Sequence, residues 1–82
     1  MSIEEIFQTM RELVAEQFAL EPEEVTMDTA FEEDLGADSV DLVELVMAME
    51  EEFELGQTAE DEVKAIKTVG DAVNYVAGKL NG

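Results

Sequence analysis

The 82-residue sequence contains no cysteine, no histidine and no tryptophan, and only one proline. Without histidine or cysteine, the chain cannot form a Ser-His-Asp triad, a cysteine nucleophile or a zinc site with nitrogen or sulfur ligands. The lack of disulfides fits a reducing compartment, and no apolar run approaches the roughly 20 residues that span a bilayer. We therefore expect a soluble, cytoplasmic protein that is not an enzyme.

Cations are also scarce, because 4 Lys and Arg stand against 22 Asp and Glu and leave a net charge of −18. Nucleic acids and anionic membranes bind proteins through basic side chains and would repel this chain. The only cations are Arg11, Lys64, Lys67 and Lys79, and the only acids outside residues 12–63 are Glu4, Glu5 and Asp71. This unbroken acidic interval indicates a docking surface for basic partners. Solubility alone is the alternative interpretation.

Apolar residues make up 46% of the chain, which is too much for a disordered acidic protein. The length favours one domain over residues 1–82. Apolar residues recur at helical spacing over about 3–18, 39–53 and 69–80. The expected buried positions are Ile3, Ile6, Phe7, Met10, Leu13, Val14 and Phe18, then Leu42, Leu45, Val46, Met49 and Phe53, and finally Val69, Ala72, Val73, Val76, Ala77 and Leu80.

A weaker signal over residues 57–67 predicts a short third helix, and no alternating β pattern occurs. The predicted fold class is therefore all-α, a small four-helix bundle of three main helices and a short third one. Ser2 with Glu5 and Thr68 with Asp71 have the spacing of capping boxes, and Asp38 is a good N-cap for the second main helix.

Residues 19–38 form a long predicted connection that can include short helical turns. Its apolar residues should hold it on the core; they are Leu20, Val25, Phe31 and Leu35. Gly36, just before the second main helix, is expected to adopt a backbone angle that other residues avoid.

The helix over 39–53 carries a second apolar stripe, formed by Val40, Val43 and Met47 and centred roughly 130° from the core-facing stripe at 100° per residue. Acidic residues border it; they are Glu44 and Glu51 on one side and Glu50 on the other. Either the helix is buried on two sides, or an exposed apolar strip with a charged rim meets a partner.

Ser39 opens the same helix, where a serine ordinarily serves as a cap or a first-turn residue. It cannot act as a self-activated nucleophile, because the chain has no histidine to serve as its base. As an acceptor of a phosphate-linked group it is better placed, since the free N–H groups and the dipole of a helix start favour an anion.

The run from Asp34 to Met47 reads Asp-Leu-Gly-Ala-Asp-Ser-Val-Asp-Leu-Val-Glu-Leu-Val-Met. With residues 50–53 and 66–76, it resembles the acyl carrier proteins of bacterial dissociated (type II) fatty acid synthesis. The resemblance implies a four-helix bundle in which Ser39 carries 4′-phosphopantetheine, installed from coenzyme A by a phosphopantetheinyl transferase (holo-ACP synthase). The thiol of this group would hold a growing acyl chain as a thioester, and the apolar interior could shelter that chain.

The resemblance also implies a monomer that docks on ketosynthases, reductases, dehydratases and acyltransferases through their basic patches. Together with the stripe, it predicts a partner surface made of Asp38, Val40, Asp41, Val43, Glu44, Met47, Glu50 and Glu51. Two departures from the family pattern stand out. Val40 replaces the leucine that usually follows the modified serine, and residues 55–59 are polar and one residue longer than the common form.

Two other functions stay open at this point. One is a carrier for another pathway, such as polyketide, D-alanyl or specialised lipid synthesis. The other is an acidic calcium-binding or scaffold protein, although the segment from Asp28 lacks EF-hand spacing, because Ala30, Glu32 and Glu33 occupy positions that would need ligands or glycine. No specific metal site is predicted.

The net charge of −18 predicts that added salt stabilises the fold, because counter-ions screen the repulsion between carboxylates. The melting temperature should rise between low and physiological ionic strength. Thermal melts followed by circular dichroism across a salt series measure this, and a flat series contradicts strong self-repulsion.

Overall fold

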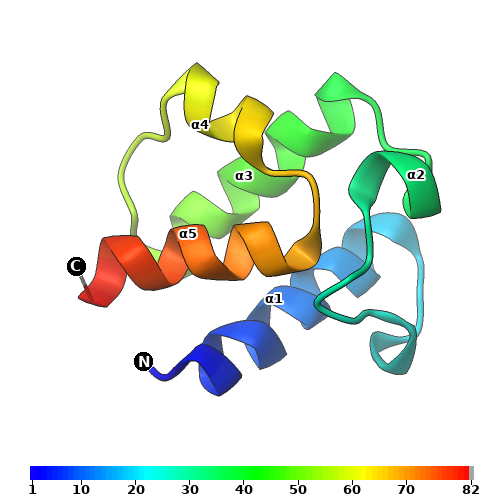
Figure 1. The fold of residues 1–82 in the computed structure, drawn as a ribbon, viewed down its shortest axis with the longest axis horizontal. Coiled ribbons are helices and arrows are strands. Elements are labelled where there is room, and N and C mark those ends of the chain that lie inside the picture. Colours follow the sequence, from blue (N-terminus) through cyan, green and yellow to red (C-terminus); the bar gives the residue numbers. More distant parts are fainter. Residues whose placement is uncertain (82) are drawn as a thin grey trace.

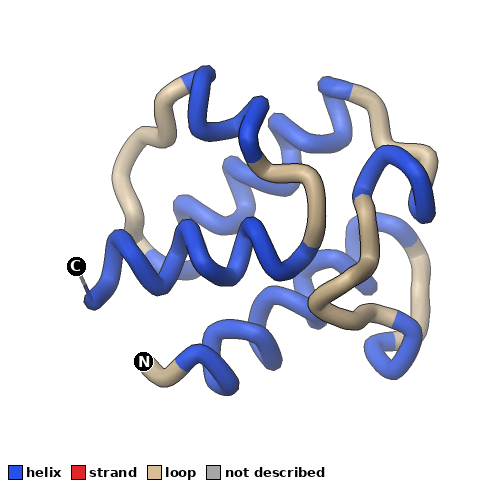
Figure 2. The backbone as a smooth tube through the Cα atoms, in the orientation of Figure 1, coloured by secondary structure: helices blue, strands red, loops and turns tan. Residues whose placement is uncertain are grey.

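The computed structural model describes residues 1–81. Its elements are α1 (Ile3–Phe18), the 3-10 turn η1 (Pro22–Glu24), α2 (Phe31–Leu35), α3 (Ser39–Phe53), α4 (Glu60–Ala65) and α5 (Val69–Asn81). Helix α1 packs against both α5 and α3, and α4 lies beside α3 (Figures 1 and 2). The predicted all-α bundle is confirmed, with α2 as an additional short helix inside the long connection.

The helix starts are fixed by the predicted capping residues. The Glu5 N–H donates to Ser2 Oγ at 3.1 Å, and the Ser2 N–H donates to the Glu5 carboxylate at 2.9 Å. The bond from the Ser2 N–H is the main reason that the pKa of the Glu5 carboxyl lies below its usual value. At the start of α5, Thr68 and Asp71 also exchange two hydrogen bonds, each of 3.1 Å. Such reciprocal bonds satisfy backbone N–H groups that a helix leaves unpaired at its start, so the boundaries of α1 and α5 follow from local sequence.

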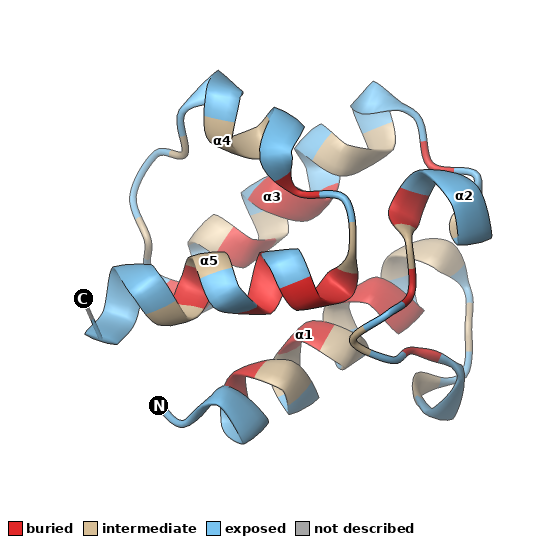
Figure 3. Cartoon of the chain, viewed as in Figure 1, coloured by how far each residue is buried: buried red, intermediate tan, exposed pale blue. Residues whose placement is uncertain are grey.

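The core lies where α1, α3 and α5 meet (Figure 3). Its fully buried side chains are Ile6, Met10, Val14, Val25, Phe31, Leu45, Met49, Val69, Val73 and Val76. The prediction that Ile3 and Leu80 are buried is wrong, since they are 46% and 39% exposed. Both lie in the outermost turns of their helices, next to the chain ends, where no described element covers them.

The long connection is held to α1 by Arg11. Its Nε donates to the Pro22 carbonyl at 3.0 Å and its Nη2 to the Val25 carbonyl at 3.1 Å, while the guanidinium lies 4.8 Å from the Phe7 ring centroid. A guanidinium that bridges two carbonyls and stacks on an aromatic ring orders the loop without needing a carboxylate partner. The predicted anchors Val25 and Phe31 are fully buried, and Leu20 and Leu35 are half-buried against the core.

The second half of the connection is joined to the turn between α4 and α5 by main-chain hydrogen bonds. Phe31 N–H donates to Lys67 O at 3.0 Å, Val69 N–H to Thr29 O at 2.9 Å, and Gly70 N–H to Met27 O at 2.8 Å. We call these three bonds the 27–70 junction. It lets the chain approach α5 closely, which fixes where α2 and then α3 begin.

None of the helices in residues 1–81 is long and apolar enough to cross a membrane.

Gly70 allows the close approach at this junction, because a β-carbon there would lie 3.0 Å from Met27 O. This oxygen already accepts the Gly70 N–H and cannot move without stretching that bond. We predict that Gly70→Ala lowers the free energy of unfolding by about 1 kcal/mol through overpacking.

Gly78, in the same helix, is the matched control, because a β-carbon added there would meet nothing within 4 Å. Gly78→Ala should raise stability by about 0.5–1 kcal/mol, as alanine loses less backbone entropy on folding. Urea denaturation of both variants measures the difference. A Gly70→Ala protein as stable as the wild type would show that the junction tolerates a side chain.

Candidate functional site

Ser39 is the first residue of α3 and follows the N-cap Asp38. The Asp38 carboxylate accepts the Asp41 N–H at 2.9 Å, and the Asp41 carboxylate accepts the Asp38 N–H at 3.1 Å. Ser39 itself is exposed, and no hydrogen bond to its hydroxyl is found within residues 1–81. The capping box therefore fixes the backbone around Ser39 while the neighbouring carboxylates, rather than the serine, perform the capping.

The segment that precedes Ser39 is held in place by Gly36 and Phe31. Gly36 ends α2 with a left-handed φ of 65°, as expected, and the Ala37 N–H then donates to Phe31 O at 2.9 Å. Phe31 is fully buried and stacks on Phe18 with ring centroids 6.4 Å apart. The left-handed conformation of Gly36 and the buried Phe31 ring together restrict the backbone that leads into α3.

Gln17 gives a second support that the sequence does not reveal. Its side-chain amide donates to the Asp41 carbonyl at 2.7 Å, so the end of α1 is tied to the first turn of α3. Gln17 lies outside the apolar stripe of α1, and nothing in the spacing from residue 17 to 41 indicates a contact between them.

A cleft of about 620 Å³ opens beside Ser39. Phe31, Leu42 and Ile66 lie along its apolar part. Its charged lining residues are the cations Lys64 and Lys67, which are two of the four cations of the chain, and the acids Glu32, Glu33 and Asp38. Lys64 has only a long, exposed ion pair with Glu60, at 3.7 Å, which is worth little in water. The exposed Ser39 hydroxyl thus lies beside a partly apolar cleft along which an elongated attached group could lie, with two lysines among acids to offset the charge of a phosphodiester.

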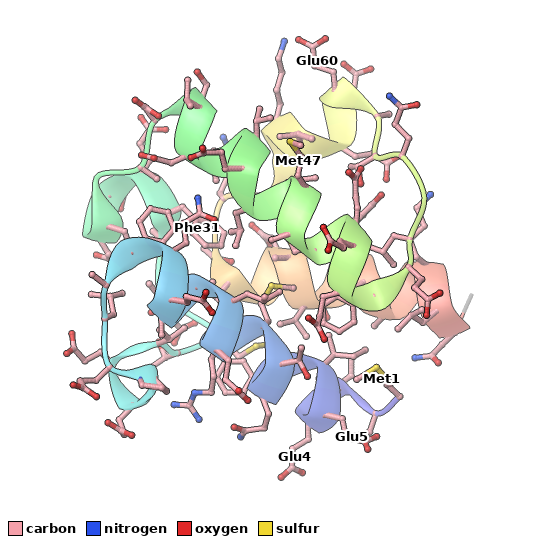
Figure 4. All side chains as sticks on the ribbon, turned by 180° about the vertical axis from the view of Figure 1, so that it is seen from behind. Met1, Glu4, Glu5, Phe31, Met47 and Glu60 are labelled. Atoms are coloured by element: carbon pink, nitrogen blue, oxygen red, sulfur yellow. The ribbon has the colours of Figure 1, made fainter. Side chains whose placement is uncertain are left out.

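The second stripe of α3 is exposed, with Val40, Val43 and Met47 at 63%, 48% and 61%. Figure 4, in which α3 is seen in front, shows the Met47 side chain on this helix. The interpretation that α3 is buried on two sides is therefore wrong. The alternative, an exposed apolar strip that is available to a partner, stays a prediction.

The predicted acidic rim is less uniform than its sequence suggests. Glu44 and Glu51 are exposed, while Glu50 is half-buried and its carboxylate accepts the backbone N–H of Thr58. Asp41 is half-buried and occupied in the capping box. Glu44 and Glu51 therefore keep their carboxylates free of the protein hydrogen bonds that engage Glu50 and Asp41.

A second cleft, of about 340 Å³, lies between α3 and the segment that leads into α4. Its apolar walls are Val43, Val46, Met47 and Val63, and its polar residues include Glu50 and Thr58. The exposed stripe and this cleft thus share Val43 and Met47. In residues 1–81 no group of three or more acidic side chains is arranged to hold a metal ion.

Comparisons with known proteins identify the family of the chain. The family model described as a phosphopantetheine attachment site matches residues 8–76, and 4′-phosphopantetheine is accordingly the cofactor. A curated acyl carrier protein from Sulfurovum sp. is 49% identical over 71 residues, which are 87% of this chain and 93% of the relative.

A solved acyl carrier protein structure, from Enterococcus faecalis, has the same fold with a TM-score of 0.79. It is 32% identical, and the match covers 96% of this chain and 99% of the other. Members of this family carry groups for other enzymes rather than catalysing reactions themselves, and they interact in general with a phosphopantetheinyl transferase and with synthesis enzymes. On the family model, the curated relative and the shared fold, the chain belongs to the acyl carrier proteins.

Proposed function

We propose that the chain carries growing fatty acyl chains on 4′-phosphopantetheine attached to Ser39 and presents them to the enzymes of fatty acid biosynthesis. The observation that carries this proposal is the exposed Ser39 on the capped first turn of α3, between a cleft and an exposed apolar stripe. The thiol at the end of the group supplies the thioester chemistry that the cysteine-free chain lacks.

In the attachment, Ser39 Oγ forms a phosphodiester bond with the pantetheine-bearing phosphorus of coenzyme A. The adenosine bisphosphate portion leaves, and the hydroxyl proton passes to a base of the transferase. This chain contributes the positioning of Ser39, because Asp38 and Asp41 hold each other in the capping box. Lys64 and Lys67 line the cleft that Ser39 shares and would offset the negative charge of the phosphodiester among the surrounding acids.

We further propose that residues 38–51 form the docking surface for the transferase and for ketosynthases, reductases, dehydratases and acyltransferases. Its apolar centre is Val40, Val43 and Met47, and its acidic residues are Asp38, Asp41, Glu44, Glu50 and Glu51. An apolar centre with a charged rim supports fast, salt-sensitive association with basic patches. The chain would work in the cytoplasm as a monomer, with residues 1–82 as one acyl carrier domain.

The cleft between α3 and α4 is the proposed shelter for the acyl chain. Its walls include Val43, Val46, Met47 and Val63, and each methylene group removed from water there contributes roughly 0.8 kcal/mol. Because Val43 and Met47 also belong to the docking surface, a docked enzyme covers the opening of this cleft.

The attachment at Ser39 predicts a gain of one prosthetic group when the chain is incubated with coenzyme A and a phosphopantetheinyl transferase. Intact-mass spectrometry measures it. Ser39→Ala should gain nothing. Ser2, the only other serine of the chain, provides the control, because Ser2→Ala loses only the cap of α1 and should be modified like the wild type. A Ser39→Ala protein that still gains the mass contradicts the assignment.

The docking surface predicts that Glu44→Lys weakens binding to a basic partner, such as a ketosynthase, by about two- to fivefold at low salt, the range for exposed charge pairs. The loss should shrink as salt screens the remaining charges. Dissociation constants across a salt series, with circular dichroism to verify folding, test this.

Glu52→Lys makes the same charge change on the same helix, at a side chain that is exposed but turned roughly 150° from the middle of the stripe. The dissociation constant of Glu52→Lys for the same partner should stay closer to that of the wild type. Equal losses for the two variants would show that only net charge matters, and no loss for Glu44→Lys would remove Glu44 from the surface.

A further inference from the structure

Thr58 joins the segment between α3 and α4 to two helices at once. Its backbone N–H donates to the Glu50 carboxylate of α3, and its Oγ1 accepts the Tyr75 hydroxyl of α5 at 3.0 Å. All three residues are half-buried. Hydrogen bonds shielded in this way are stronger than exposed ones, and an unpaired polar group left behind at such a position is costly. We call Glu50, Thr58 and Tyr75 the Thr58 latch.

The latch lies at one end of the cleft between α3 and α4. Glu50 and Thr58 line this cleft together with Val43, which is the lining residue of α3 nearest to Ser39 in sequence. At 1.5 Å per residue, Val43 lies about 6 Å and Glu50 about 16 Å along α3 from Ser39. A chain that enters from the Ser39 side therefore meets the latch last.

The chemistry of the cleft changes along this path. The walls are apolar at Val43, Val46, Met47 and Val63, whereas the remote end presents the Glu50 carboxylate and the Thr58 main chain. The other polar lining residues are Gln57, next to Thr58, and Glu60, at the start of α4. Burying a methylene group against these apolar walls is favourable in free energy. Placing a methylene group at the remote end is unfavourable for two reasons. Hydrocarbon over the Glu50 carboxylate removes the water that solvates it, and displacing Thr58 breaks both of the hydrogen bonds that Thr58 makes.

We propose that the Thr58 latch sets the longest acyl chain that the cleft between α3 and α4 shelters. Thr58 and Tyr75 are in this sense specificity-determining positions, which act by holding the loop rather than by contact with the thioester. The inference rests on the proposed carrier function and adds to it a residue-level limit on chain length.

The test uses two variants that each remove one partner of the Thr58–Tyr75 hydrogen bond and little else. Tyr75→Phe keeps the ring on the core and loses the hydroxyl. Thr58→Val keeps the shape of the side chain and the backbone N–H that binds Glu50. Thr9→Val on α1, also half-exposed and outside the latch, is the matched control for a threonine-to-valine change.

The first measurement needs no attached group. Amide hydrogen exchange at Thr58 should be about fivefold faster in Tyr75→Phe and Thr58→Val than in the wild type, the factor that corresponds to one lost hydrogen bond. Thr9→Val should leave it unchanged. Unchanged exchange in both latch variants would show that the Tyr75 hydroxyl does not hold the loop and would overturn the proposal.

The second measurement follows the melting temperature of the protein loaded with saturated acyl chains of increasing length. In the wild type and in Thr9→Val, the rise in melting temperature with chain length should level off at the same length. In the latch variants the plateau should move to longer chains, by about one two-carbon unit, because further methylene groups can then be buried.

Loading is verified by intact mass before each melt, so the two hypotheses fail differently. A wild-type chain that gains no mass contradicts the carrier function and, with it, the length limit. Loaded latch variants whose plateau coincides with that of the wild type contradict the latch alone and leave the carrier function standing.

Discussion

The 27–70 junction is the constraint on which the rest of this small fold depends. A chain of 82 residues with net charge −18 has little Coulombic attraction available, and the ion pair found in residues 1–81 is a long, exposed one between Glu60 and Lys64. Cohesion must come from the apolar core and from hydrogen bonds that do not need cations. The junction supplies three such bonds where a long connection passes α5, and so fixes the start of α3.

In this position, α3 has one face buried in the core and another apolar face exposed. Leu45, Val46, Met49 and Phe53 are buried, while Val40, Val43 and Met47 stay exposed. Within residues 1–81, no ion pair joins an acid beside the exposed stripe to a cation. In the proposed docking to basic partners, much of the electrostatic compensation would occur only on association.

Local features of this structure could be predicted from sequence, and long-range ones could not. The helix periods, the capping boxes and the left-handed Gly36 depend on residues within a few positions of one another. Periodicity also reveals the second stripe of α3, but not whether another element covers it. The contacts of Gln17 with Asp41 and of Thr58 with Tyr75, and the approach of Lys64 to the Ser39 cleft, arise from how the helices are placed in space. Ile3 and Leu80 follow the helical period yet are exposed, since a period does not say where packing ends.

The two ends of the described chain lie side by side, with the Asn81 side-chain amide donating to the Met1 carbonyl at 3.2 Å. Both ends lie at one side of the molecule, whereas α2 and the start of α3 lie at the other (Figure 1). Neighbouring ends of this kind are the geometry in which circular permutation and insertion into a host loop are tolerated. The fold can therefore be tethered, labelled or embedded in a larger polypeptide through either end, on the side of the molecule away from the start of α3 (Figure 1).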